Sequence, residues 1–309
     1  MHALSESILQ TAQRIRELKV QGARNIAIAA IEAIQGLASK SKARNRKEFL
    51  QELSEARQVL FESRETEPLM RNALRWITHQ VETSKETRVK ELSKTVQQCS
   101  RQFLKNLKDS KEKIAEIGAK RIKDDTVILT HCHSSTVTYL LEKAKQQGRD
   151  FQVIVTETRP VFQGRITAQE MLKLGIKTTL IVDSAARHFM NQVDLAIVGA
   201  DAVTSEGNVV NKIGTSMIAL TAQEARTPFY VVTELLKFDP ATTMGDYEKI
   251  EERNPTEIWK DPPRNLIIRN PAFDVTRRDF IHGIICEEGI ISPHSILETM
   301  HRKYPWVFE

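Results

Sequence analysis

The chain has 309 residues, 40% of them hydrophobic, which is enough to build a sizeable core in one large domain or two of ordinary size. Mean hydropathy is −0.36, and no run approaches the roughly 20 apolar residues that a membrane-spanning helix needs. The net charge of +5 fits an anionic partner, either a phosphorylated metabolite or RNA, and does not choose between them.

The first residues lack a basic region followed by an apolar stretch, so we expect no secretory signal. Cys99, Cys132 and Cys286 are too few and too scattered for a disulfide framework, and they are typical of reduced thiols in a cytosolic protein. The basic run from Lys40 to Lys47 has no interleaved aromatic residues. It is therefore interpreted as a solvated face and not as a nucleic-acid site.

Residues 1–122 carry apolar side chains at helical spacing, which predicts a helical bundle. Apolar stripes are found at Leu4, Ile8, Ala12 and Ile15, and again at Leu50, Leu53, Ala56 and Leu60. The segment 23–38 is apolar nearly all round and should form the central, buried helix. Asn45, followed by Glu48, is a capping pair at a helix start. A long helix is expected from about Ser84 to Ile117.

From residue 123 onward the pattern changes to short apolar runs, at 127–129, 153–155, 179–182, 195–198, 230–232, 266–268 and 284–285. Most of the early runs are separated by helix-length amphipathic stretches, which predicts a parallel sheet buried on both faces. Thr167 and Glu170 form a capping box, and Gly175 should end the helix that they start. The expected fold class is α/β: an N-terminal helical bundle (1–122) followed by a Rossmann-like, doubly wound, mostly parallel sheet domain (123–309).

Chemically capable side chains follow the predicted strands, where ligands bind in open α/β sheets. Residues 130–135 place a thiol, two imidazoles and two hydroxyls before a helix start whose N–H groups can hold a phosphate. Residues 156–160 add a carboxylate and the Arg159 guanidinium. Asp201 follows a glycine turn and is well placed to move protons.

Two further polar segments complete this edge: the helix start at 211–215, and Glu234 with Lys237 after the run 230–232. Each of these side chains also has a structural interpretation. A single cysteine is often a small buried hydrophobe, Asp201 can cap a helix, and Arg159 and Lys237 can be surface charges. Their convergence on strand ends and helix starts favours a functional site.

Several known types of site are argued against. His131 and His133 alternate with Cys132, so on an extended chain the three side chains cannot all point at one zinc ion. The sequence also lacks a dinucleotide fingerprint, a phosphate-binding loop ending in Gly-Lys-Ser/Thr and a Gly-x-Ser-x-Gly elbow. These absences argue against a dehydrogenase, a nucleoside triphosphatase and a serine hydrolase.

The ordered motifs resemble those of archaeal ribose-1,5-bisphosphate isomerases, over essentially the whole chain. The motifs are Thr-His-Cys-His-Ser (130–134), Thr-Glu-Thr-Arg-Pro (156–160), Gly-Ala-Asp (199–201), Asn-Lys-Ile-Gly-Thr (211–215), Lys237-Phe238 and Asn-Pro-Ala-Phe-Asp-Val-Thr (270–276). The wider superfamily includes methylthioribose-1-phosphate isomerases and the alpha, beta and delta subunits of initiation factor 2B. The isomerases carry Cys and Asp where the alpha subunits typically show Gly and Glu, and this chain has Cys132 and Asp201.

The resemblance implies that Cys132 and Asp201 are a catalytic acid/base pair. In this interpretation Asp201 donates a proton to the ring oxygen and a Cys132 thiolate takes the proton from C2. Nearby cations and a helix start are expected to lower the pKa of the thiol toward neutrality. No metal or organic cofactor is expected, and the resemblance implies a homodimer or homohexamer.

Substrate contacts are implied at Gly22, Ala23, Arg64, Ser134, Ser135, Thr136, Asn211, Lys212 and Lys237. Arg159 joins them from its place after a strand. Arg24 is added because the isomerases usually have Arg-Gly-Ala where this chain has Gln21-Gly22-Ala23, and Arg24 can reach the same phosphate.

Three departures from the isomerase pattern keep alternatives open: Gln21, Glu65 in place of a proline, and Ser135 in place of a lysine. Together they remove cationic character where a bisphosphate should bind. One alternative is a non-catalytic regulatory subunit that binds initiation factor 2 or senses a nucleotide or sugar phosphate. Another is an isomerase of a different phosphosugar, such as methylthioribose 1-phosphate.

Overall fold

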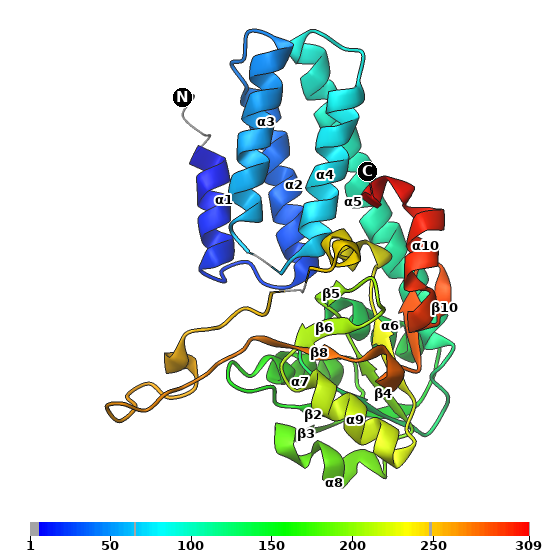
Figure 1. The fold of residues 1–309 in the computed structure, drawn as a ribbon. Helices are drawn as coiled ribbons and strands as arrows, with labels where there is room; N and C mark the ends of the chain where they lie inside the picture. The colour runs from blue at the N-terminus through cyan, green and yellow to red at the C-terminus, as the bar shows by residue number, and fades with distance from the viewer. Residues whose placement is uncertain (1–5, 65, 247–248, 309) are drawn as a thin grey trace. The chain divides into compact units, whose positions relative to one another are not determined.

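The computed structural model describes residues 6–64, 66–246 and 249–308 (Figure 1). The chain forms two compact units, Met1–Asp109 with Tyr304–Glu309, and Ser110–Lys303. The units part within the long helix, whereas the predicted division after residue 122 lies just beyond that helix and stays a prediction. None of the helices in the described residues is long and apolar enough to cross a membrane.

The first unit is a helical bundle of α1 (Glu6–Arg16), α2 (Ala23–Lys40), α3 (Arg46–Phe61), α4 (Pro68–Thr83) and most of α5 (Val89–Ala119). Helix α2 packs against α1, α3 and α4, which confirms the prediction of a central buried helix. Asn45 caps α3 as predicted, because its side chain accepts a hydrogen bond from the Glu48 N–H at 3.0 Å. The stripe that begins at Leu4 is buried at Ile8, Ala12 and Ile15, and Leu4 itself lies outside the described residues.

Helix α5 begins at Val89, so the predicted start at Ser84 is wrong. The Arg46 guanidinium donates to the carbonyl oxygens of Glu82 and Ser84 at 2.7 and 2.9 Å. Because these carbonyls are the last ones of α4 and its cap, Ser84 belongs to the end of that helix.

The second unit is built on a seven-stranded sheet in the order β10-β9-β7-β4-β1-β2-β3, in which only the β9–β10 pair is antiparallel. Its strands are β1 (Thr126–Thr130), β2 (Phe151–Thr156), β3 (Lys177–Ile181), β4 (Leu195–Val198), β7 (Phe229–Val232), β9 (Gly283–Cys286) and β10 (Gly289–Ile291). The helices of this unit are α6 (Ser135–Gln146), α7 (Gln163–Lys173), α8 (Ala186–Met190), α9 (Thr215–Ala225) and α10 (Ile296–Lys303). The predicted mostly parallel α/β sheet is confirmed.

A second, three-stranded antiparallel sheet was not predicted. It consists of β5 (Ala202–Val203), β6 (Val209–Lys212) and β8 (Phe273–Thr276), in the order β5-β6-β8. These strands are too short for their alternation to stand out in the sequence. The sheet matters for function because its central strand ends at Lys212.

Two local predictions in this unit are wrong. The apolar run 266–268 is not a strand but part of an arm, defined here as residues 251–270, that extends from the second unit (orange in Figure 1). Leu266 and Ile267 are 49% and 85% exposed there. Thr167 does not cap a helix, because α7 already begins at Gln163, although Gly175, at φ 68°, follows the end of that helix as predicted.

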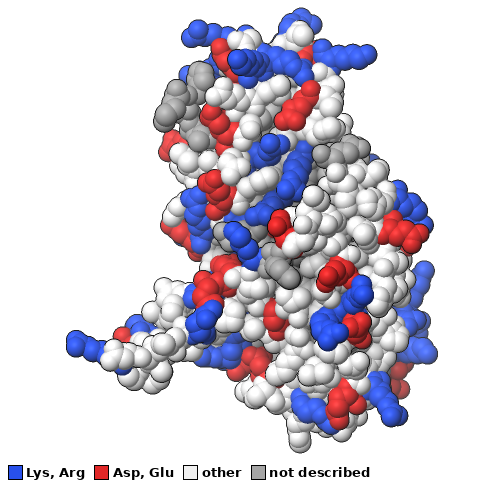
Figure 2. All heavy atoms as spheres, viewed as in Figure 1, with Lys and Arg blue, Asp and Glu red and all other residues white. Residues whose placement is uncertain are grey.

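The basic run from Lys40 to Lys47 is largely exposed, in agreement with its interpretation as a solvated face. On the face of the second unit seen in Figure 2, basic and acidic side chains are interspersed. The visible face therefore presents no continuous basic surface of the kind that nucleic-acid binding favours.

Candidate active site

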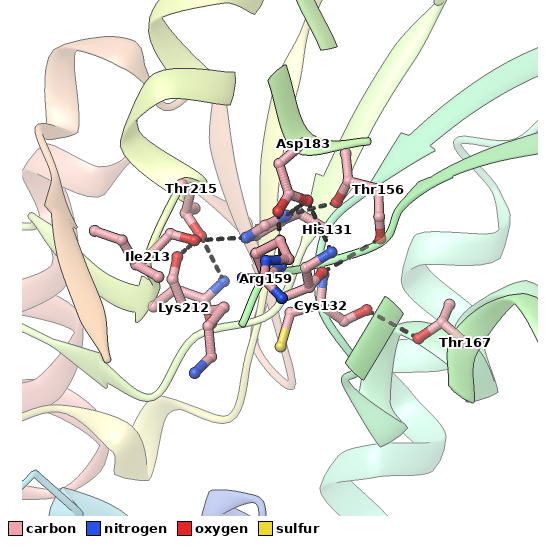
Figure 3. Close-up of polar contacts among 12 residues, drawn as sticks. His131, Cys132, Thr156, Arg159, Thr167, Asp183, Lys212, Ile213 and Thr215 are labelled. Carbon is pink, nitrogen blue, oxygen red and sulfur yellow. Dashed lines mark hydrogen bonds and ion pairs between the residues drawn. The ribbon is translucent and has the colours of Figure 1, made fainter. Parts of the chain in front are cut away.

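The Cys132 loop (residues 131–134) follows β1 and leads into α6 (Figure 3). Cys132 adopts a φ of 68°, in the left-handed region that non-glycine residues rarely adopt. Two threonines hold this backbone: the Cys132 N–H donates to Thr158 Oγ1, and the Cys132 carbonyl accepts from Thr167 Oγ1, both at 2.9 Å. The loop is thus fixed by the segment after β2, which holds Thr158, and by helix α7, which holds Thr167. No role was predicted for Thr158, and Thr167 was predicted to cap a helix instead.

His131 is buried and connects the Cys132 loop to Thr156 and to the Ile213 backbone through hydrogen bonds. The alternation of His131 and His133 with Cys132 argued only against a zinc site and predicted no role for this histidine. Its Nε2 lies 2.8 Å from the Ile213 carbonyl, which only accepts, so Nε2 carries the proton and donates. Nδ1 then accepts from the Thr156 hydroxyl at 2.6 Å. Burial lowers the pKa of His131 and favours this neutral form. Both ring nitrogens are therefore occupied by hydrogen bonds, and in the described ranges no three His, Cys, Asp or Glu side chains gather as a metal site.

Asp183, just beyond β3, is a residue that the sequence analysis missed. Its two oxygens accept from the N–H groups of Thr158 and Arg159 at 2.8 and 2.7 Å, which fixes the loop after β2. A carboxylate directly after the third strand is placed like Asp201 after the fourth. The same rule about strand ends could therefore have found it.

The helix start at residues 213–216 is held by Asp274 of β8. Its carboxylate accepts from the N–H groups of Gly214 at 2.8 Å and Ser216 at 3.1 Å. Burial raises the pKa of Asp274 to about 6, although these two N–H groups act to lower it. The motif 270–276 thus supports the site from the second sheet.

The Cys132 thiol and the Lys212 ammonium point to the same side of these loops (Figure 3). Burial raises the pKa of Cys132 to about 11, the charge of Lys212 acts to lower it, and the negative charges of Asp201 and Asp183 raise it further. The expected shift toward neutrality is therefore wrong. The protein holds Cys132 as a thiol at neutral pH because burial outweighs the nearby cation.

Alkylation of Cys132 is expected to follow this high pKa. Since only the thiolate reacts, the rate of labelling by iodoacetamide should rise about tenfold per pH unit from pH 7 to 10 and show no plateau in that range. Peptide mass spectrometry measures the rate at Cys132 separately from that at Cys99. A plateau near pH 8 would contradict the thiol form.

Lys212 is the cation whose charge acts to lower the pKa of Cys132. It is 8% exposed at the end of β6, and its Nζ lies 5.4 Å from the centre of the Phe273 ring. Within the part of the chain that the structure describes, no carboxylate forms an ion pair with this ammonium. A buried cation without a counter-ion is costly in a folded protein and suits an anionic ligand.

Asp201 lies in the turn after β4. Its N–H donates to the Val210 carbonyl at 2.9 Å, and the preceding Ala200 carbonyl accepts from Lys237 Nζ at 2.7 Å. The start of the same turn packs on the Cys132 loop. A Cβ added at Gly199 would lie 2.7 Å from Ser134 Oγ and 2.8 Å from its Cβ.

The substitution Gly199→Ala is therefore expected to lower the free energy of unfolding by about 1 to 3 kcal/mol, because the turn or the Cys132 loop must shift. Thermal or urea unfolding measures this. Gly36→Ala is the matched control, since its added Cβ would meet only Ser7 Oγ at 3.9 Å. That control should be neutral or stabilising by up to about 1 kcal/mol, because alanine favours the helix.

The remaining predicted residues of the second unit lie near the same strand ends. Ser134 is the N-cap of α6, accepting from the Val137 N–H at 3.4 Å, and Ser135 and Thr136 begin that helix. Asn211 is buried and its amide donates to Thr215 Oγ1 at 3.0 Å. Arg159 is exposed, and its guanidinium donates to the Ile258 carbonyl of the arm at 3.3 Å.

The predicted residues of the first unit are described within that unit alone. Gly22, at φ 83°, precedes Ala23 at the start of α2, and the Arg24 guanidinium donates to the Leu107 carbonyl at 2.8 Å. Arg64 Nε lies 3.3 Å from a buried oxygen of Glu67. Their part in a substrate site stays a prediction, and Glu65 lies outside the described residues.

Comparisons with known proteins point in one direction. A model of the initiation factor 2 subunit family matches residues 19–293. Ribose 1,5-bisphosphate isomerase of Thermococcus kodakarensis is 41% identical over 99% of this chain and 98% of its own length. The isomerase of the same name from Archaeoglobus fulgidus is 41% identical over 93% of this chain and 90% of its own.

Solved structures show the same fold. A crystal structure of a Pyrococcus horikoshii protein described as translation initiation factor eIF-2B superposes with a TM-score of 0.82 at 32% identity, covering 94% of this chain and 98% of that one. A 5-methylthioribose 1-phosphate isomerase from the same organism superposes with a TM-score of 0.79 at 29% identity, covering 96% and 87%.

Proposed function

Because the chain belongs to the initiation factor 2 subunit family, we propose that it is the family's sugar-phosphate isomerase that converts ribose 1,5-bisphosphate to ribulose 1,5-bisphosphate. One observation carries the chemistry. Cys132 lies at the carboxyl end of β1, and the charges of Lys212, at the end of β6, and of Asp201, after β4, both act on the pKa of its thiol. The archaeal relatives that share this chain's length bear the same activity in their names.

The reaction moves hydrogen from C2 of the sugar to C1 and opens the ring. A base takes the proton from C2 as the bond between C1 and the ring oxygen breaks, and an acid gives a proton to that oxygen. The resulting enol then loses its hydroxyl proton and gains a proton at C1, which yields the ketone. One acid and one base are enough, and no redox partner is needed.

Cys132 and Asp201 can supply this pair if the thiol proton passes to Asp201 before the reaction. The resulting thiolate takes the C2 proton, and the protonated Asp201 gives its proton to the ring oxygen. The Lys212 ammonium favours both the thiolate and the negative charge that develops on the enol oxygen. The raised thiol pKa makes this first transfer a required step.

The substrate's phosphates need cations and N–H donors. Lys212 and the start of α6, with Ser134 as its N-cap, suit one phosphate. Arg24 and Arg64 stay substrate contacts that the family resemblance implies. No metal or organic cofactor is part of this proposal.

The test is to incubate the purified protein with α-ribose 1,5-bisphosphate and to follow ribulose 1,5-bisphosphate, with methylthioribose 1-phosphate in a parallel reaction. Turnover of the bisphosphate alone supports the proposal. Turnover of only methylthioribose 1-phosphate would replace the substrate and keep the chemistry.

The second candidate is a non-catalytic regulatory subunit, favoured by Gln21 and Ser135, which remove cationic character, and by the fold shared with the P. horikoshii protein. It predicts binding of a sugar phosphate without turnover and co-purification with initiation factor 2. Cys132 and Asp201 count against it, because a subunit without catalysis does not need this pair.

Association of copies through the second unit is also proposed, as a homodimer or a homohexamer in the cytosol. Exposed apolar side chains of this unit support it: Ile258, Trp259, Leu266 and Ile267 on the arm, Leu180 and Val182 at and after β3, and Met217 and Leu220 on α9. A relative by fold forms a tetrameric beta2-delta2 complex. Leu220→Asp should lower the mass measured by light scattering, whereas Leu9→Asp, exposed in the first unit, should not.

A further inference from the structure

The buried ion pair between Glu234 and Lys237 is not used by the chemistry described above. Glu234 follows β7 and is 1% exposed, while Lys237 ends the short helix η2 (Leu235–Lys237) and is 5% exposed. Glu234 Oε2 lies 3.5 Å from Lys237 Nζ. Because the pair is neutral as a unit, its charge adds little to the attraction of a phosphate, in contrast to Lys212.

Each partner of this pair also holds a different loop of the site. Lys237 Nζ donates to the Ala200 carbonyl at 2.7 Å, in the peptide group that leads into Asp201. The Thr136 hydroxyl, at the start of α6, donates to Glu234 Oε1 at 3.4 Å. The ion pair of Glu234 and Lys237 thus connects the start of α6, which follows β1, with the turn after β4 and the segment after β7.

The backbone beneath Glu234 is itself fixed. The N–H of Leu235 donates to both oxygens of Glu287, at 3.3 and 3.1 Å, and Glu287 is 8% exposed. Strand β7 pairs with β4 and β9, and it ends two residues before Glu234. The carboxylate of Glu234 therefore projects from a rigid base, as a positioning group requires.

We propose that Glu234 is a positioning residue for the isomerisation: its carboxylate holds the Lys237 ammonium on the Ala200 carbonyl and so fixes the turn that carries Asp201. The inference rests on the proposed function of this site. An ammonium has three N–H bonds; Ala200 takes one and Glu234 attracts a second, so Glu234 also sets the direction of the third. A displacement of Asp201 by about 1 Å is enough to slow catalysis by up to about a hundredfold.

The first test is the substitution Glu234→Gln, which keeps the shape and removes the charge. We expect kcat to fall about tenfold to a hundredfold while KM for ribose 1,5-bisphosphate changes less than about threefold. Glu234→Asp, which keeps the charge, should recover part of kcat. Glu112→Gln is the matched control, since Glu112 also pairs with a lysine, Lys143, and accepts from Tyr139, and it should leave kcat unchanged.

The second test asks whether Glu234 acts through Lys237. In a Lys237→Met background, adding Glu234→Gln should change kcat less than about twofold, because the bond to Ala200 is already lost. The double variant leaves neither charge buried alone, so it also serves if a single variant folds poorly. An equal loss of kcat from Glu234→Gln in both backgrounds would overturn the inference, as would a rise in KM with unchanged kcat.

A third measurement separates this inference from the proposed function. Hydrogen exchange of the amides in residues 199–203 should be faster in Glu234→Gln than in the wild type, with exchange in β2 and β3 unchanged. If the wild type shows no turnover of the bisphosphate, the proposed substrate is wrong. Hydrogen exchange alone then tests whether Glu234 positions the turn that carries Asp201. Unchanged exchange at 199–203 would overturn the positioning role.

Discussion

The substitution Cys132→Ser is expected to lower kcat for ribose 1,5-bisphosphate by about a thousandfold, with a smaller change in KM. A serine hydroxyl has nearly the shape of the thiol but is a much weaker acid, so it gives up its proton to Asp201 far less readily and does not form the base that takes the C2 proton. General acid and base groups typically contribute about a hundredfold to ten-thousandfold to rate. The backbone at Cys132, with a φ of 68°, is equally strained with either residue, so the fold should be retained.

Steady-state kinetics with a coupled assay for ribulose 1,5-bisphosphate measures this effect. Asp201→Asn should cause a loss of similar size, and the double variant should be little slower than either single one, because the two groups act as a unit. Cys99→Ser is the matched control, since Cys99 lies on α5 in the first unit. Retention of more than about a tenth of kcat in Cys132→Ser would remove the thiol from the acid/base pair.

The substitution Lys212→Met is expected to make the protein more stable and much less active. Methionine fills a similar volume without a charge, so removing the buried ammonium should raise the free energy of unfolding by about 1 to 2 kcal/mol. The same change removes the cation that favours the thiolate and the enolate, so kcat/KM should fall by about a hundredfold or more. The pKa of Cys132 should rise above its value of about 11, because the charge of Lys212 lowers it.

Lys237→Met is the matched control for this prediction. Both lysines are more than nine-tenths buried, but Lys237 is paired with Glu234. Its removal takes away the counter-ion of a buried carboxylate and should lower the free energy of unfolding by about 3 kcal/mol. Chemical unfolding of the two variants measures both changes in the free energy of unfolding, the expected rise in Lys212→Met and the expected fall in Lys237→Met. A lower stability in Lys212→Met would show that its charge is compensated in the folded protein.

The sequence predicts the main sheet well because its core strands are continuous apolar runs. Strand β4, for example, occupies the predicted residues 195–198. The run 266–268 misled the prediction because an exposed apolar arm and a buried strand have the same local pattern, and only a neighbouring strand distinguishes them. The strands β5, β6 and β8 escaped notice because they are only 2, 4 and 4 residues long, and because β8 pairs with β6 from a distant part of the sequence.

The candidate site was predictable in its members and not in its electrostatics. The rule that ligands bind beyond strand ends groups Cys132 and Asp201 from the sequence alone, and Lys212 joins them from a predicted helix start. The pKa of Cys132 could not be predicted, because it depends on how far burial outweighs one cation. The tautomer of His131 likewise depends on the Ile213 carbonyl, a backbone group 82 positions away that no side-chain pattern reveals.

The left-handed backbone at Cys132 also bears on how this fold diverges. A cysteine there strains the chain by about 1 to 2 kcal/mol, which a glycine would relieve. A single change from cysteine to glycine would therefore remove the reactive group and relax the loop together. Once such a change is fixed in a lineage, a return to catalysis must first give up that stability. The geometry at this position therefore makes loss of the thiol an easy evolutionary step and its recovery a hard one.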